Sequence, residues 1–226
     1  MTARALTSQA LTITGPAGGL EALLEVPAPA TPGGQPVGGA LICHPHPQHG
    51  GTMHNKVVHT VARAFHEHGW ATLRFNFRGV GASVGTYAEG VGETADAIAA
   101  AAWLVERFAG APLALAGFSF GGAVAFNAAA VLNPALLITV APAIDRVSVA
   151  LSGRPTSPWL VVQGDADDVV AAARVQSWVA AFEPQPEPVV LPGVGHFFHG
   201  ALSDLRTAVE QFVGKKRPGA VEAPGS

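Results

Sequence analysis

The chain has 226 residues, 49% of them hydrophobic and 13% charged, which is enough apolar material for the core of a single domain, expected over residues 1–213. Its formal net charge of −3 gives no basic footprint for nucleic acid, so we expect no nucleic-acid partner. The single cysteine, Cys43, excludes an intramolecular disulfide, and because no secretory signal or membrane-spanning run is recognisable, we expect a cytoplasmic protein without a membrane partner.

The first predicted elements form an antiparallel edge. Residues 11–14 and 20–26 have the pattern of two short strands, and the glycine-rich residues 15–19 form the turn between them. Residues 27–39 are crowded with proline and glycine, which is typical of a surface loop.

From residue 40 onward, short apolar runs alternate with helical patterns. The predicted strands are residues 40–43, 70–77, 112–116, 136–140, 159–163 and 188–191. The predicted helices are residues 53–68, 93–108, 171–182 and 202–213, together with one that opens at Gly121. This alternation favours right-handed crossovers, so the expected fold class is α/β, with a mostly parallel central sheet and helices on both faces. Residues 214–226 are rich in proline and glycine and are expected to form a mobile tail.

A G-x-S-x-G pentapeptide, residues 117–121, lies between a predicted strand and the helix that follows it. Such a pentapeptide is typical of a nucleophile elbow, in which the glycines allow a sharp turn that exposes the serine hydroxyl above the sheet. Ser119 is therefore the candidate nucleophile.

Polar residues follow several of the predicted strands directly. They are His44, Ser119, the aspartates of residues 164–168, and His196. Ligands of open parallel sheets bind beyond the carboxyl ends of the strands, so these residues are expected to meet at one site. A serine needs a base to take its proton and an acid to orient that base. The chain order serine, aspartate, histidine is that of the α/β-hydrolases.

Several motifs in this order resemble the α/β-hydrolase superfamily, and in particular a group of small bacterial serine hydrolases without a lid. The motifs are residues 44–47, 50–56, 74–81, 117–121, 164–167 and 195–199. The resemblance covers about residues 20–213. It implies the α/β-hydrolase fold without a lid domain and a serine hydrolase activity that needs no cofactor.

By the same resemblance the acid of the triad is Asp167, which matches a G-x-x-D pattern after a strand. Asp165 and Asp168 compete with it, and Asp145 follows an earlier strand where some members of the superfamily carry the acid. The position directly after Gly195 identifies His196 as the base, with His199 as its rival.

Acyl transfer also requires hydrogen-bond donors for the developing oxyanion. The elbow offers the backbone N–H of Phe120, the residue after the nucleophile. The second donor is implied by resemblance to the His-Gly-x pattern of the superfamily, and this places it at His46. Pro45 and Pro47 lack an N–H, so His46 is the donor that remains between them.

A run of histidines invites a metal interpretation, because imidazole binds zinc, copper and nickel. The run comprises His44, His46, His49 and His54. It lacks an obvious set of carboxylates or thiolates, so no native metal is expected. No Gly-Lys-Ser/Thr phosphate loop occurs either, and no nucleotide is implied.

The expected substrate is a small or short-chain carboxylic ester. Only residues 141–158 separate two predicted strands at the place where many α/β-hydrolases insert a cap, so the site should be open. Phe118 and Phe120 are its expected aromatic neighbours. Phe197 and Phe198 are expected to pack beneath their loop, with a place in the lining of the pocket as the alternative. A peptidase, a thioesterase with the same triad, or a catalytically silent binding module remain as alternatives.

Overall fold

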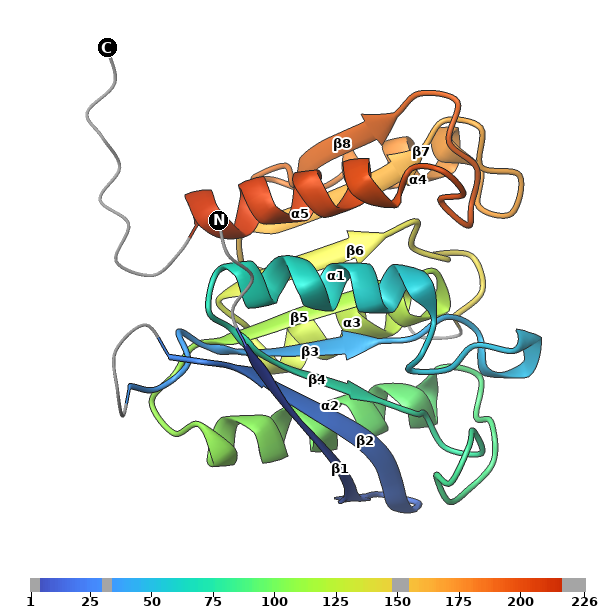
Figure 1. Cartoon of the computed structure of the whole chain (residues 1–226). Helices are drawn as coiled ribbons and strands as arrows, with labels where there is room; N and C mark the ends of the chain where they lie inside the picture. Colours follow the sequence, from blue (N-terminus) through green and yellow to red (C-terminus); the bar gives the residue numbers. More distant parts are fainter. Residues whose placement is uncertain (1–4, 30–33, 148–154, 217–226) are drawn as a thin grey trace.

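The computed structural model describes residues 5–29, 34–147 and 155–216, so most of the predicted tail lies outside the described residues. Its centre is an eight-stranded sheet with the strand order β1-β2-β4-β3-β5-β6-β7-β8 (Figure 1). The strands are β1 (Leu6–Gly15), β2 (Gly18–Pro27), β3 (Gly39–Cys43), β4 (Ala71–Phe75), β5 (Leu113–Phe118), β6 (Leu136–Val140), β7 (Trp159–Gly164) and β8 (Glu187–Leu191). The helices are α1 (Lys56–Glu67), α2 (Val91–Arg107), α3 (Phe120–Leu132), α4 (Ala172–Val179) and α5 (Leu202–Lys215), with a short 3₁₀ helix η1 (Pro47–His49).

The sheet combines an antiparallel edge with a parallel body. β1 and β2 form a hairpin closed at Gly15 and Gly18, and β2 pairs antiparallel with β4. All other neighbours, from β4 through β3 and β5 to β8, are parallel. The predicted α/β class with antiparallel N-terminal strands is confirmed.

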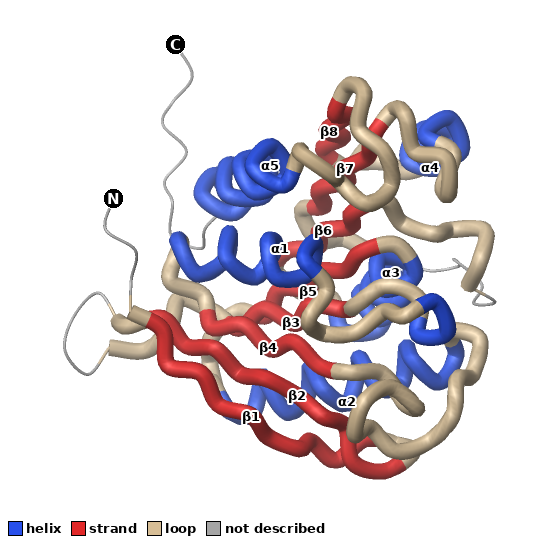
Figure 2. The backbone as a smooth tube through the Cα atoms, turned by 45° about the vertical axis from the view of Figure 1, so that its right-hand side comes forward, coloured by secondary structure: helices blue, strands red, loops and turns tan. Residues whose placement is uncertain are grey.

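Helices cover both faces of the sheet. The residues of α1 and α5 form one apolar cluster on one face, and those of α2, α3 and α4 contribute to a second cluster on the other (Figure 2). Every residue of β3, β4, β6 and β7 is buried. Strands buried on both faces favour apolar side chains at successive positions, which is why they stand out in the sequence as mainly apolar runs. The exceptions are the buried polar residues Thr72 and Arg74 of β4, Thr139 of β6 and Gln163 of β7.

All five helices differ from their predicted bounds, and α1 and α4 differ the most. The helix predicted from residue 53 begins at Lys56, because the Asn55 side chain accepts a hydrogen bond from the N–H of Val57 (2.9 Å) and so caps the helix there. The N–H of Met53 instead donates to Asn76 Oδ1 (2.8 Å). The helix predicted for residues 171–182 ends at Val179, and tighter turns carry the chain on to Phe182.

The parallel strands all point the same way, toward the right in Figure 1, so their carboxyl ends and the loops that follow them gather at one side of the molecule. In the part of the chain that the structure describes, none of the helices is both long and apolar enough to cross a membrane.

Candidate active site

Ser119 stands at a strained turn between β5 and α3. Its backbone angles are φ 55° and ψ −118°, a region that residues other than glycine rarely adopt. The Ser119 N–H donates to the carbonyl of Val140 (2.8 Å), and the Ser119 carbonyl accepts from Gly122 (2.9 Å) and Ala143 (3.0 Å). These bonds from β6 and the loop after it hold the turn in its strained form.

The two glycines of the pentapeptide are required by close backbone approach. A Cβ at Gly117 would collide with the backbone of Gly121, and a Cβ at Gly121 would collide with the carbonyl oxygens of Cys43 and His44 at the end of β3. The motif therefore lets α3 start directly against β3, which brings Ser119 next to the loop after that strand.

The structure brings Ser119, His196 and Asp167 together. His196 Nε2 lies 3.0 Å from Ser119 Oγ, and His196 Nδ1 lies 2.8 Å from Asp167 Oδ2. All three residues are buried, with exposed fractions of 7%, 4% and 8%. A histidine that contacts a serine hydroxyl with one nitrogen and a carboxylate with the other is placed to accept the serine proton.

Asp167 is held as a carboxylate by several donors. Its Oδ1 accepts the N–H groups of Val169 (2.9 Å) and Val170 (2.7 Å), and its Oδ2 accepts Gln163 Nε2 (2.9 Å) in addition to His196. Burial acts to raise the pKa of Asp167, but the hydrogen bonds from His196 and the two backbone N–H groups outweigh it and leave this pKa below its ordinary value. The group is therefore ionised at neutral pH.

The four alternative residues for the acid and the base lie outside the triad. Asp165 accepts the Gly193 N–H (2.6 Å), and Asp145 forms an exposed ion pair with Arg174 (2.7 Å). Asp168 is exposed, and His199 Nδ1 lies 3.2 Å from Lys56 Nζ on the surface. The geometry favours Asp167 and His196 over all four.

Two backbone N–H groups beside Ser119 are free to bind an oxyanion. Those of His46 and Phe120 form no hydrogen bond with any of the described residues. The two rings pack together with centroids 5.0 Å apart, and both residues line the same cavity as Ser119. The predicted pair of donors thus lies at the nucleophile.

His44 is a site residue whose role the sequence did not reveal. It is completely buried, and burial lowers its pKa to about 4, so that the ring is neutral at pH 7. Its Nε2 accepts the N–H of Phe77 (3.0 Å), which leaves the ring proton on Nδ1 to be donated to the Pro45 carbonyl (2.6 Å). In a trans peptide the C=O and N–H point in opposite directions. The Pro45 carbonyl and the His46 N–H belong to the same peptide group, so the hydrogen bond from His44 to the carbonyl directs this N–H away from the His44 ring.

The cavity at Ser119 has a volume of about 120 Å³. It is lined by Pro45, His46, His49, Gly50, Gly51, Asn55, Ser119, Phe120, Ala143, Arg146, Val169, His196 and Phe197. Of the two arrangements considered for Phe197, the structure has the one in which it lines the cavity, and its side chain is 51% exposed. Phe118 is buried beneath the site, with its ring 5.1 Å from that of His196. Phe198 is fully buried against Phe118, as expected.

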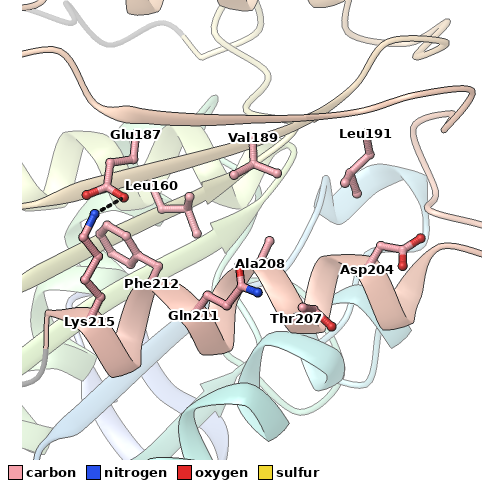
Figure 3. Close-up of a pocket in the computed structure, with 10 residues that line it drawn as sticks. All are labelled: Leu160, Glu187, Val189, Leu191, Asp204, Thr207, Ala208, Gln211, Phe212 and Lys215. Atoms are coloured by element: carbon pink, nitrogen blue, oxygen red, sulfur yellow. Dashed lines mark ion pairs between the residues drawn. The ribbon is translucent and has the colours of Figure 1, made fainter.

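A larger groove of about 500 Å³ separates β8 from α5 (Figure 3). Its walls are formed by apolar side chains such as Val189, Leu191 and Phe212, with the ion pair between Glu187 and Lys215 at one end (3.5 Å). It shares no residue with the cavity at Ser119 and contains no pairing of a nucleophile with a base. Size therefore does not identify the reactive site in this molecule.

No metal-binding cluster of three or more His, Cys, Asp or Glu side chains is present in residues 5–29, 34–147 and 155–216. Within the histidine run, the His46 and His49 rings stack with centroids 4.4 Å apart, while His44 is committed to the backbone as described above. Cys43 is buried, and burial raises the pKa of its thiol, so it is a core residue and no rival nucleophile.

Comparison with known proteins identifies solved structures and sequences that are similar to this chain. A solved α/β serine hydrolase without a lid from Xanthomonas campestris is 42% identical, with a TM-score of 0.88 over 95% of this chain and 97% of that one. An α/β serine hydrolase homologue from Coxiella burnetii is also 42% identical, with a TM-score of 0.83 over 90% and 96% of the two chains. An uncharacterized protein of Rickettsia prowazekii is 31% identical over 77% of each chain. Residues 47–155 match the family of serine aminopeptidases of type S33.

Proposed function

Because the chain belongs to the α/β serine hydrolases, we propose that it cleaves small or short-chain carboxylic esters through an acyl-enzyme on Ser119. The observation that carries this proposal is the continuous line of hydrogen-bond distances from Ser119 Oγ to His196 (3.0 Å) and from His196 to Asp167 (2.8 Å). The buried, donor-rich setting of Asp167 supports its role as the orienting acid.

The proposed reaction follows from these positions. Ser119 Oγ attacks the ester carbonyl while His196 Nε2 takes the hydroxyl proton, and the Asp167 carboxylate stabilises the resulting imidazolium through Nδ1–H. The negative charge on the former carbonyl oxygen is bound by the N–H groups of Phe120 and His46. His196 then returns the proton to the leaving alcohol, and a water molecule releases the acid by the same steps in reverse.

Small substrates are favoured by the size and openness of the site. The cavity of about 120 Å³ holds only a short acyl or alcohol group, and a long lipid chain needs a longer covered groove. The connection from β6 to β7 comprises only residues 141–158, of which residues 148–154 lie outside the described part of the chain. The Xanthomonas relative is likewise described as lacking a lid.

A series of p-nitrophenyl esters of increasing acyl length tests the substrate class. Turnover per enzyme is expected to peak at acetate to butanoate and to fall steeply for acyl chains of about ten carbons or more, because these exceed the cavity. A preference of the purified protein for the long-chain esters would contradict this substrate class while leaving the serine mechanism in place.

A peptidase is the second candidate, supported by the match of residues 47–155 to serine aminopeptidases. It uses the same nucleophile but must protonate an amine leaving group. Comparing an amino acid p-nitroanilide with the p-nitrophenyl ester of the same amino acid separates the two activities. An esterase is expected to cleave the ester alone at a measurable rate, whereas cleavage of the anilide at a comparable kcat/KM would favour the peptidase.

Two substitutions of His44 test how the second oxyanion donor is oriented. Asparagine places an amide near the position of Nδ1 and can still donate to the Pro45 carbonyl, whereas glutamine reaches only the position of Nε2. His44→Gln is therefore expected to lower kcat by about tenfold to 100-fold with little change in KM, because an oxyanion donor acts mainly in the transition state. His44→Asn should retain most of kcat.

The free energy of unfolding of both variants, measured by urea denaturation, provides the control. Both remove one of the two hydrogen bonds of a buried ring, so both should be less stable than the wild type. If kcat fell equally in the two variants, or followed their stability, His44 would serve packing alone.

A further inference from the structure

Arg146 lies in the loop after β6 and lines the cavity together with Ser119 and His196. Its position is tied to the nucleophile through the backbone. The Arg146 N–H donates to the carbonyl of Ala143 (3.1 Å), and the Ala143 N–H donates to the carbonyl of Ser119 (3.0 Å). The backbone of Arg146 is thus connected to that of Ser119 by two successive hydrogen bonds.

The positive charge of Arg146 has no counterion among the described residues at the cavity. None of those residues that line the cavity is an aspartate or glutamate, and Arg146 forms no ion pair with any of the described carboxylates. The neighbouring Asp145 pairs instead with Arg174 (2.7 Å), and the Asp167 carboxylate is bound by His196. These two acidic groups are therefore engaged elsewhere.

The His46 ring does not add a second positive charge to the cavity. Burial, His49 and Arg146 together lower the pKa of His46, so its ring is neutral at pH 7. Among the described residues that line the cavity, Arg146 is the only lysine, arginine, aspartate or glutamate. In a chain with a formal net charge of −3, an unpaired cation beside the nucleophile is a specific feature of the site and does not reflect the overall charge.

We propose that Arg146 binds a carboxylate of the substrate, so that the preferred substrates are small esters that carry a free carboxylate on the acid or the alcohol portion. This inference rests on the ester hydrolysis proposed above. A guanidinium presents a planar set of donors that matches the two oxygens of a carboxylate. Because the cavity of about 120 Å³ is small, the carboxylate has to lie only a few bonds from the ester group.

Two matched pairs of esters test the proposal, each differing only in whether a carboxylate or an acetyl group is present. Monomethyl succinate is compared with methyl levulinate, and acetoxyacetate with acetoxyacetone, by acid release at constant pH. For at least one pair, the wild type is expected to favour the anionic ester about two- to fivefold in kcat/KM, the range for an ion pair that stays in contact with water.

Arg146→Gln is expected to abolish this preference, and Arg146→Lys to keep part of it. Arg107→Gln is the control, because Arg107 is the last residue of α2 and lies over the Phe108 ring outside the cavity. The preference of the wild type should also shrink as the ionic strength rises from about 0.02 to 0.5 M, since salt screens an exposed pair.

The outcomes separate this inference from the proposed function. If the neutral esters are cleaved as well as the anionic ones, or if Arg146→Gln lowers kcat/KM equally for both members of each pair, carboxylate binding is wrong and the esterase stands. If none of the four esters is cleaved in a Ser119-dependent manner while the protein is folded, both proposals are overturned.

Discussion

Replacement of Ser119 by alanine is expected to lower kcat for short-chain esters by about 10⁶-fold, because it removes the only group that can form the acyl-enzyme in the proposed mechanism. KM should change little, since the His46 and Phe120 N–H groups and the rest of the cavity remain. The backbone strain at φ 55° is present in both proteins, so alanine should not unfold the elbow.

Covalent labelling gives the second readout for Ser119. A fluorophosphonate should label the wild type at this residue and leave Ser119→Ala unlabelled. Ser203→Ala is the matched control, because Ser203 is an exposed hydroxyl near the start of α5, and it should behave as the wild type in both assays. Residual activity of Ser119→Ala above about 1% of the wild type would require another nucleophile, as would labelling of this variant.

Asp167→Asn is expected to lower kcat by about 10⁴-fold while preserving the fold. The Asn side chain can keep the hydrogen bonds from Val169 and Val170 with its oxygen. Its NH₂ group then faces His196 Nδ1, where it donates and places the ring proton on Nε2. His196 Nε2 then has no lone pair to accept the Ser119 proton, which is the reason for the loss.

The neighbouring aspartates provide controls of identical chemistry. Asp165→Asn and Asp168→Asn should each retain kcat within a few-fold, because neither carboxylate contacts His196. A large loss in either of these variants, with a small one in Asp167→Asn, would move the acid to another position and contradict the proposed triad.

Stability against pH gives an independent readout of Asp167. Its pKa is lowered in the folded protein, so it contributes stability that is present above the pKa of an unfolded aspartate and is lost as the pH falls through the folded value. Urea denaturation should therefore show a weaker loss of stability on acidification in Asp167→Asn than in the wild type. Equal pH dependence would indicate that the carboxylate gains nothing from its donors.

Much of the fold could be predicted because its inner strands are buried on both faces. Runs such as residues 136–140 and 159–163 have no polar alternation, and in a parallel sheet they must pair with neighbours of the same kind. The helix boundaries were less predictable. Met53 has an apolar side chain that fits the pattern of α1, yet its backbone is held by Asn76, a residue 23 positions along the chain.

Three features could be predicted from the residues alone: the α/β class, the elbow with Ser119, and the order of serine, aspartate and histidine along the chain. These features depend on local patterns, namely burial of successive residues, glycines at a turn, and polar residues that follow strands directly. The likeness to lidless serine hydrolases agrees with this assignment.

Which of the clustered polar residues share the site follows from the three-dimensional arrangement of the loops. Asp165, Asp167 and Asp168 are nearly equivalent in the sequence, but the turn after β7 directs only Asp167 at His196. The hydrogen bond of His44 to the Pro45 carbonyl and the place of Arg146 beside Ser119 were likewise invisible. The reason is that sequence spacing fixes the direction of a side chain within its own element, whereas distances between loops depend on the register and packing of strands far apart in the chain.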